Sequence, residues 1–387
     1  MPAEPARARP LDGLLVADLT RVLAGPTATM MLADLGARVV KVERPGDGDD
    51  TRRFGPPWAG SSSAYFESAN RSKESIALDF TDAGDLRLAR ELVARADIVV
   101  QNYVTGGLAR YGLDEPTVRA ANADVIYLSI TGFGSGAGAA ELGYDFLVQA
   151  VGGYMSITGQ LDDQPGGQPT KVGVAVIDLL AAKDAVMGIL AAVVHRQRTG
   201  AGQHVEVDLM STAVASLANQ ASSFLATGVV PQRMGNRHPS IAPYETVRCR
   251  DGYLALAVGN DRQWVAVAGL LGDDELAADP RFATNSARVE HHAELLGRLE
   301  RGFATDDVAV WVTRLRAAAV PAGKVNDVAE ALALATELGL QPTVDVGPAH
   351  PAQVRHPVRY SAFEPVAPTA PPALDQHGAD LRAWLEA

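Results

Sequence analysis

Short apolar runs alternate with amphipathic stretches through the first half of the chain, and this alternation predicts successive strands and helices. In chain order, the predicted elements are a strand at 14–19, a helix at 26–36, a strand at 39–43, a helix at 86–95, and strands at 98–100 and 125–130. Glycine often follows the last residue of a helix, and Gly36 fits that position. Strand–helix alternation of this kind predicts a mainly parallel α/β sheet with helices on both faces.

The pattern changes after Met234. A predicted strand at 253–258 is followed by predicted helices at 262–271, 289–303, 308–318 and 325–340. We therefore expect a large Rossmann-like α/β domain over residues 1–229 and a smaller α+β domain over residues 230–330. We expect the C-terminal segment, residues 331–387, to return to the large domain.

Composition and charge narrow the class of protein. The chain has 387 residues, 47% of them hydrophobic and 21% charged, which describes an ordinary folded protein. Acidic residues outnumber basic ones by 46 to 34 and no long basic run occurs, so a nucleic-acid partner has no electrostatic support. Lys183 and Asp184 interrupt the longest apolar stretch, so no membrane span is expected. The single cysteine, Cys249, excludes an intrachain disulfide and fits a cytoplasmic location.

One carboxylate has an unusual sequence context. A mostly apolar, β-branched approach over residues 169–177 leads to Asp178 at the start of a long apolar helix. An anion there meets unpaired backbone N–H groups and the positive end of the helix dipole. We therefore expect the carboxylate to stay ionised in one orientation, as a nucleophile requires. Aspartate is also a preferred N-cap residue, so simple helix capping explains the same position.

The familiar catalytic motifs are absent from the sequence. There is no Walker A motif, no G-x-S-x-G, no H-E-x-x-H and no pair of cysteines. The adjacent His291 and His292 point to different sides of a helix, so no metal site is expected. The glycine-rich stretch at 132–138 lacks the third glycine of a dinucleotide fingerprint, having Ala137 there, which disfavours an oxidoreductase. The remaining candidates for catalytic and binding groups are carboxylates, backbone amides and glycine-rich loops.

Polar clusters follow three of the predicted strands, at residues 20–26, 41–53 and 101–110. Ligands of open α/β sheets bind at the carboxyl ends of the strands, so these clusters predict one site there. Together these clusters, whose cations include Arg21, Lys41, Arg44, Arg52 and Arg53, favour an extended anionic ligand with phosphates. Charged strand ends and solvated loop residues explain the same cations without a ligand.

Taken together, these segments resemble family III CoA-transferases, the group that includes formyl-CoA transferase, carnitine CoA-transferase and the α-methylacyl-CoA racemases. The resemblance runs from about Leu11 to Glu386 and is carried by residues 18–26, 32–37, 40–43, 70–76, 96–102, 143–145, 235–239 and 321–326. In this family the aspartate that begins a Gly-Ile-Leu-Ala-Ala helix is the catalytic carboxylate. Asp178 precedes that pentapeptide, which starts at Gly188, by ten residues.

The resemblance implies a reaction and its partners. Asp178 would attack an acyl-CoA to give a mixed anhydride, which the CoA thiolate would convert to an aspartyl-CoA thioester. A small carboxylic acid would then accept the CoA by the reverse steps. CoA is thus a substrate, and no tightly bound cofactor or metal is expected. Members of the family form interlocked homodimers, so we expect one here.

The same resemblance assigns residues to the site. Its CoA contacts fall at Arg21, Val22, Ala24, Arg44, Leu78, Asn102, Tyr103 and Arg110, and its substrate pocket at Tyr144, Gly235, Asn236, Arg237 and His238. Residues 235–244 are its candidates for oxyanion donors. Thr81 replaces a family lysine and Val104-Thr105 replaces Arg-Pro, which predicts redistributed phosphate contacts. Leu23 and Phe54 replace the Gln and Trp of oxalate-using members, which disfavours oxalate.

A racemase or epimerase on the same fold is the main alternative. That reaction uses a histidine–aspartate pair, and Tyr144 stands at the position of the histidine. A phenol is a poor base at neutral pH, so the transferase is favoured. A noncatalytic CoA-binding protein is a further alternative. The sequence identifies neither the donor acyl-CoA nor the acceptor acid.

Overall fold

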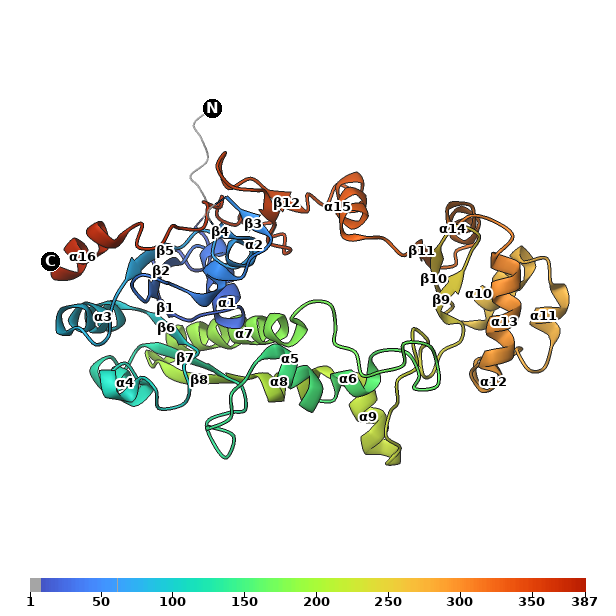
Figure 1. The fold of residues 1–387 in the computed structure, drawn as a ribbon, viewed down its shortest axis with the longest axis horizontal. Coiled ribbons are helices and arrows are strands. Elements are labelled where there is room, and N and C mark those ends of the chain that lie inside the picture. Colours follow the sequence, from blue (N-terminus) through green and yellow to red (C-terminus); the bar gives the residue numbers. More distant parts are fainter. Residues whose placement is uncertain (1–7, 61) are drawn as a thin grey trace. The chain divides into compact units, whose positions relative to one another are not determined.

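A computed structural model describes residues 8–60 and 62–387. The chain forms two compact units. The first unit contains residues 8–154, 172–226 and 341–387, and the second contains residues 155–171 and 227–340. Each unit is described by itself below (Figure 1).

A six-stranded sheet forms the centre of the first unit, with the strand order β5-β2-β1-β6-β7-β8 and every neighbouring pair parallel (Figure 1). The strands are β1 (Leu15–Leu19), β2 (Arg38–Glu43), β5 (Glu74–Ala77), β6 (Ile98–Gln101), β7 (Ile126–Thr131) and β8 (Gln203–Asp208). This confirms the predicted parallel α/β sheet. The order reverses direction between β1 and β6, and such a switch point is where doubly wound sheets bind ligands.

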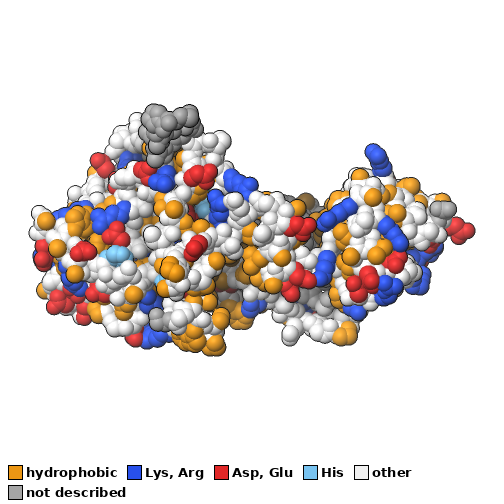
Figure 2. Space-filling model, turned by 90° about the horizontal axis from the view of Figure 1, so that it is seen from above, with side chains coloured by type: hydrophobic (Ala, Val, Ile, Leu, Met, Phe, Trp, Pro, Cys, Tyr) orange, Lys and Arg blue, Asp and Glu red, His pale blue; other side chains and the backbone are white. Residues whose placement is uncertain are grey.

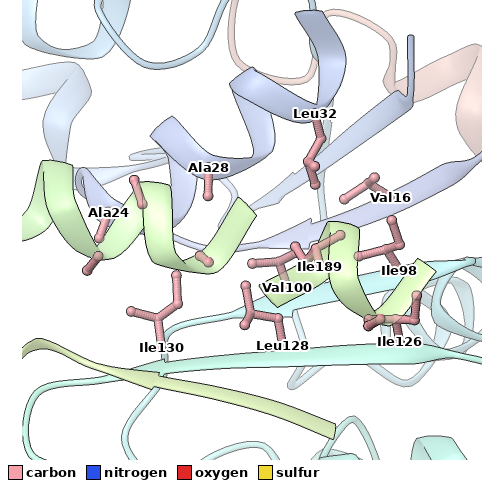
Figure 3. Close-up of a cluster of buried hydrophobic side chains, with 14 of the residues drawn as sticks. Val16, Ala24, Ala28, Leu32, Ile98, Val100, Ile126, Leu128, Ile130 and Ile189 are labelled. Carbon is pink, nitrogen blue, oxygen red and sulfur yellow. The ribbon is translucent and has the colours of Figure 1, made fainter. Parts of the chain in front are cut away.

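Helices cover both faces of this sheet. On one face, α1 (Ala24–Asp34) and α7 (Val176–Thr199) pack against side chains such as Val16, Ile98 and Leu128 (Figure 3). On the other, α3 (Ala83–Arg95), α4 (Glu115–Ala121) and α16 (Gly378–Glu386) cover the side chains of alternate strand residues. The inner strands β1, β2, β6 and β7 are therefore buried on both sides, which explains their nearly continuous apolar runs.

Short elements complete the first unit. They are η1 (Asp50–Arg53), β3 (Trp58–Ala59), β4 (Ser62–Ser63), α2 (Ala64–Glu67), η2 (Ala109–Tyr111), α5 (Asp145–Val151), α8 (Leu209–Ser216), β12 (Thr343–Val344) and β13 (Gln353–Val354), with α6 (Tyr154–Ile157) and α9 (Ala218–Thr227) at its borders with the second unit. Ala218, the first residue of α9, has a left-handed φ of 47°, so α9 does not continue α8. The left-handed Gly200 ends α7.

The C-terminal residues lie along the β5 edge of the first unit. His377 donates its N–H to the carbonyl of Ser75 at 3.1 Å, and the Asp375 carboxylate accepts the N–H of Ala77 at 2.8 Å. Leu381 and Leu385 of α16 are buried against α3. These contacts satisfy backbone groups that would otherwise remain unpaired at a sheet edge.

The second unit contains a three-stranded antiparallel sheet, in the order β11-β10-β9, with helices packed against it. Its elements are β9 (Tyr244–Arg248), β10 (Tyr253–Ala257), α10 (Asp261–Leu270), α11 (Asp274–Ala278), α12 (Asn285–Glu290), α13 (His292–Phe303), α14 (Val308–Ala317), β11 (Ala322–Lys324) and α15 (Val328–Glu337). Trp264, Phe282 and Phe303 are fully buried in its core. The helix predicted at 289–303 is two helices, which meet at His291.

Charged side chains of both signs are interspersed with apolar ones over the surface seen in Figure 2. No helix within the described residues has the length and apolar character needed to cross a membrane.

Candidate active site

A cavity of about 240 Å³ opens at the carboxyl ends of β1, β6 and β7. Its walls come from the segments that follow these strands and from the first turn of α7, within the first unit. The cavity brings together seven of the predicted site residues, namely Arg21, Val22, Ala24, Asn102, Tyr103, Tyr144 and Asp178. This is the switch point of the sheet, where a ligand site was expected.

Asp178 is the third residue of α7, and its side chain lines the cavity. The N-cap of α7 is Ala175, which makes no side-chain cap bond. The prediction that Asp178 is the N-cap is therefore wrong, because the N-cap lies three residues earlier. Helix α7 itself is fixed by packing: Ile177, Ala181, Ala185 and Ile189 are buried between the helix and the sheet.

Asp145, the first residue of α5, caps α7. Its Oδ1 accepts the N–H of Ile177 at 2.8 Å and the N–H of Asp178 at 3.3 Å. Its Oδ2 accepts the amide of the fully buried Gln149 at 2.7 Å. The first backbone donors of α7 are thus bound to Asp145, and the helix terminus does not stabilise charge on Asp178 as the sequence argument assumed.

The Asp178 carboxyl is buried and unpaired. It is 9% exposed, and no residue in the described ranges donates a hydrogen bond to its side-chain oxygens. Burial raises the pKa of Asp178 to about 7, and the negative charge of Asp145 adds to the rise. The expectation of a firmly ionised carboxylate is therefore wrong: near neutral pH the group is shared between its two protonation states.

The segment after β1 forms the opposite wall of the cavity. The Arg21 guanidinium lies 4.9 Å from the centre of the Tyr103 ring and 3.8 Å from the Asp50 carboxylate. The Nε atom of Arg21 is buried and has no partner among the described residues. This cation in the cavity is suited to an anionic ligand.

Two buried ion pairs lie beneath that wall. Lys73 bonds Asp18 at 3.0 Å, and Lys41 bonds Asp49 at 2.8 Å. Burial opposes ionisation of Asp18, but Lys73, Lys41 and two threonine hydroxyls lower its pKa to about 2. Burial lowers the pKa of Lys73 to about 8 despite the attraction of Asp18. Such pairs fix the segments that they join because separating them leaves a buried charge.

Three predicted CoA contacts lie outside the cavity. Arg44 is an exposed cation paired with Asp50. Leu78 is 2% exposed in the core and donates its N–H to the carbonyl of Glu43 at 2.8 Å. The Arg110 guanidinium stacks over Tyr111 at 4.6 Å. Their roles in CoA binding stay predictions.

The predicted residues at 235–238 belong to the second unit. The Arg237 guanidinium contacts the Nδ1 atom of His292 at 3.4 Å, and His292 bonds both oxygens of the buried Glu245 at 2.8 and 2.9 Å through Nε2. Asn236 donates to the hydroxyl of Thr246 at 3.0 Å. His238 packs against Tyr244, and Gly235 has a left-handed φ of 64°.

Sequence reasoning missed two residues near the carboxylate. Asp145 entered the sequence analysis only within the motif at 143–145, although its place directly after Tyr144 indicates that it lies near the predicted substrate pocket. Tyr65 in α2 was not singled out at all. Burial raises the pKa of Tyr65 to about 12, and the negative charges of Asp178, Asp145 and Asp49 add to the rise. Within the described ranges, no cluster of His, Cys, Asp or Glu is arranged to hold a metal ion.

Comparison with known proteins decides the family. Residues 11–378 match the family described as CoA-transferase family III. The chain belongs to CoA-transferase family III. The family predicted from the sequence is confirmed, and so is the general reaction, the transfer of CoA from an acyl-CoA to a carboxylic acid.

Proteins named for a CoA-transferase reaction are similar to this chain over almost its whole length. It is 42% identical to the succinate–glutarate CoA-transferase of Agrobacterium fabrum, over 99% of this chain and 97% of that protein. It is 38% identical to the acetyl-CoA:oxalate CoA-transferase of Acetobacter aceti, over 98% and 96%. A crystal structure of a CaiB/BaiF family protein from Brucella suis is 44% identical, with a TM-score of 0.88 over 98% of this chain and 100% of that one.

Proposed function

We propose that this transferase works through covalent catalysis by Asp178. The observation that carries the proposal is a buried carboxyl group that lines the cavity at the switch point and has no hydrogen-bond partner among the described residues. A structural carboxylate at this depth is normally paired, whereas a nucleophile needs its electrons free.

The proposed reaction uses Asp178 twice. One carboxylate oxygen attacks the thioester carbonyl of the donor, the C–S bond breaks, and a mixed anhydride and the CoA thiolate result. The thiolate attacks the aspartyl carbonyl and releases the donor acid, which leaves an aspartyl-CoA thioester. The acceptor carboxylate then attacks the aspartyl carbonyl, the C–S bond breaks, and a second anhydride and the CoA thiolate result. The thiolate attacks the acyl carbonyl of the acceptor, which gives the new acyl-CoA and releases the Asp178 carboxylate. No metal, tightly bound cofactor or general base enters these steps.

The walls of the cavity suit the CoA end of the substrate. We propose that Arg21, Val22, Ala24, Asn102 and Tyr103 surround the CoA arm, with Tyr144 on the acyl side. Support comes from their common place in the cavity with Asp178. Arg44, Leu78 and Arg110 are retained from the family resemblance as contacts of the nucleotide portion.

We further propose a small dicarboxylic acid as acceptor. Support comes from relatives named for succinate, glutarate, mesaconate and oxalate. In the second unit, Gly235, Asn236, Arg237 and His238 stay the predicted substrate-pocket residues, with Arg237 supplying a cation for a carboxylate. The replacements at Leu23 and Phe54 still favour a longer diacid over oxalate.

A homodimer in the cytoplasm is also part of the proposal. Helices α9 and α15 contain no buried residue, and they expose large apolar side chains. Leu225 of α9 is 81% exposed and Val328 of α15 is 78% exposed. Uncovered apolar helices favour contact with a second copy of the chain.

Chemical trapping tests the covalent step. The protein is incubated with succinyl-CoA or acetyl-CoA and then with hydroxylamine, and the peptide that contains Asp178 is analysed by mass spectrometry. We expect a hydroxamate at Asp178 and loss of both labelling and CoA transfer in Asp178→Asn. Asp184→Asn in the same helix is the matched control, because its amide can still accept the Thr212 hydroxyl.

Two results would count against this function. Full CoA transfer by Asp178→Asn would remove the nucleophile from the mechanism. Exchange of the α-deuteron of an acyl-CoA without acyl transfer would support the racemase instead, for which a carboxyl pKa near 7 is also suitable.

A further inference from the structure

Val22, which lines the cavity, has a backbone conformation that valine avoids. Its φ is 72°, in the left-handed region that is strongly disfavoured for β-branched residues. The next residue, Leu23, is the N-cap of α1 and makes no side-chain cap bond. A strained residue between a strand and a helix persists only where its surroundings enforce it.

The backbone of residues 20–22 is held by side chains at five successive polar groups. Asp18 accepts the N–H of Thr20 at 2.9 Å, and the Lys41 ammonium donates to the carbonyl of Thr20 at 2.8 Å. Asn102 accepts the N–H of Arg21 at 2.9 Å and donates to its carbonyl at 2.7 Å. Asp49 accepts the N–H of Val22 at 3.2 Å. We call Asp18, Lys41, Asp49 and Asn102 the backbone clamp.

The backbone clamp is rigid because most of it is buried and ionically paired. Asp18 and Lys41 are 0% exposed and Asp49 is 1% exposed. Lys41 pairs with Asp49, and Asp49 is also bonded by the N–H and hydroxyl of Thr51. Asn102 directs both polar atoms of its side chain to the backbone of Arg21.

We propose that Asn102 and Asp49 are positioning residues that keep Val22 in its left-handed conformation and so hold Arg21 and the start of α1 against the cavity. This inference rests on the proposed function, because it takes CoA as the ligand of that cavity. Asn102 lies in the cavity wall, but both polar atoms of its side chain bond the Arg21 backbone, so its effect on CoA binding acts mainly through the Arg21 and Val22 backbone.

The strain at Val22 gives this idea a specific consequence. Without the clamp, Val22 relaxes to a negative φ, and the apparent affinity for CoA falls with the fraction of molecules that keep the productive backbone. Glycine adopts the left-handed conformation without a steric penalty. Val22→Gly should therefore make CoA binding much less dependent on Asn102.

A double-mutant cycle tests the proposal with CoA itself as the probe. The dissociation constant is measured by calorimetry on the full chain for the unchanged protein, Asn102→Ala, Val22→Gly and the double variant. We expect Asn102→Ala to weaken CoA binding about tenfold or more when Val22 is kept, and less than about threefold in combination with Val22→Gly. Asn122→Ala, a half-buried change at the C-cap of α4 and outside the cavity lining, is the matched control.

The cycle separates the clamp from the proposed function. Equal weakening with and without Val22→Gly, or no weakening by Asn102→Ala, would overturn the clamp while the unchanged protein still binds CoA. Failure of the unchanged protein to bind CoA would overturn the proposed function and the clamp together. If Asn102→Ala does not fold, Asn102→Asp replaces it in the same cycle, because it keeps the acceptor for Arg21 N–H and removes the donor.

Discussion

At the scale of single residues, the main feature is the cost of keeping Asp178 buried without a partner. Its neighbour Asp145 is bound to the backbone of α7 and to Gln149, and the negative charge of Asp145 raises the pKa of Asp178. The sequence argument placed Asp178 in the site but predicted a fully ionised carboxylate, whereas the pKa of Asp178 is raised. The reason is physical: the donors expected at the helix start are already used by a carboxylate distant in sequence.

The raised pKa predicts a stability that depends on pH. Because the folded state holds the Asp178 proton up to a pKa of about 7 and the unfolded chain releases it near 3.8, stability falls as pH rises between these values. Above pH of about 7 the full penalty, up to about 4 kcal/mol, is present. Asp178→Asn should therefore raise the melting temperature more at pH of about 8.5 than at about 5.5. A stabilisation by Asp178→Asn that is the same at both values would contradict the burial argument.

The same pKa predicts how the chemistry responds to pH. Single-turnover consumption of acyl-CoA should increase as pH rises through about 7, because only the ionised carboxyl attacks. Asp145→Asn removes the neighbouring charge and should move the midpoint to lower pH, while the amide oxygen can still accept the N–H of Ile177. Rapid-quench assays across pH measure both midpoints. An unchanged midpoint in Asp145→Asn would show that its charge does not act on Asp178.

At the scale of elements, the close packing between β1 and α1 builds the wall of the cavity. A Cβ atom added to Gly25 would lie 2.4 Å from Cβ of Thr20, so only glycine permits this approach. Gly25→Ala should lower the free energy of unfolding by about 1–3 kcal/mol and weaken CoA binding. Urea unfolding measures the first effect. Gly136→Ala is the control, since nothing lies within 4 Å of its added Cβ; similar losses in both variants would refute the packing argument.

The elements also show what local sequence can and cannot predict. The buried strands, such as β1 and β7, were predicted nearly to the residue because they are apolar on both faces. The left-handed Ala218 could not be predicted, because alanine gives no local sign of that conformation. Val22 was missed for the same reason. The groups that bond the backbone of Arg21 and Val22, Asn102 and Asp49, come from the segments that follow β6 and β2.

At the scale of the whole molecule, two uncovered apolar helices predict self-association. Leu225 of α9 is exposed in a helix with no buried residue, so Leu225→Glu should leave the fold of the chain intact and weaken a dimer. Light scattering after size-exclusion chromatography should show a dimer for the unchanged protein and a larger monomer fraction for the variant. A monomer at all concentrations of the unchanged protein would contradict the proposed assembly.

Across the whole chain, family motifs indicate which residues share a site but not how their side chains interact. The resemblance assigned Arg21, Asn102 and Asp178 to one site, and the structure brings the three residues into one cavity. It could not show that Asn102 is bound to the Arg21 backbone, since such bonds depend on distances between strands. The residues at 235–238 are likewise named by motif, whereas the contact of Arg237 with His292 became visible only in the folded second unit.

The most direct test of the central claim follows oxygen atoms. In the proposed mechanism an acceptor carboxylate labelled with heavy oxygen attacks the aspartyl-CoA thioester, and one labelled oxygen remains on Asp178 when the new acyl-CoA leaves. Mass spectrometry of the Asp178 peptide after turnover should show a gain of heavy oxygen that requires both acyl-CoA and labelled acceptor. Complete turnover with an unlabelled Asp178 would contradict covalent catalysis by this residue.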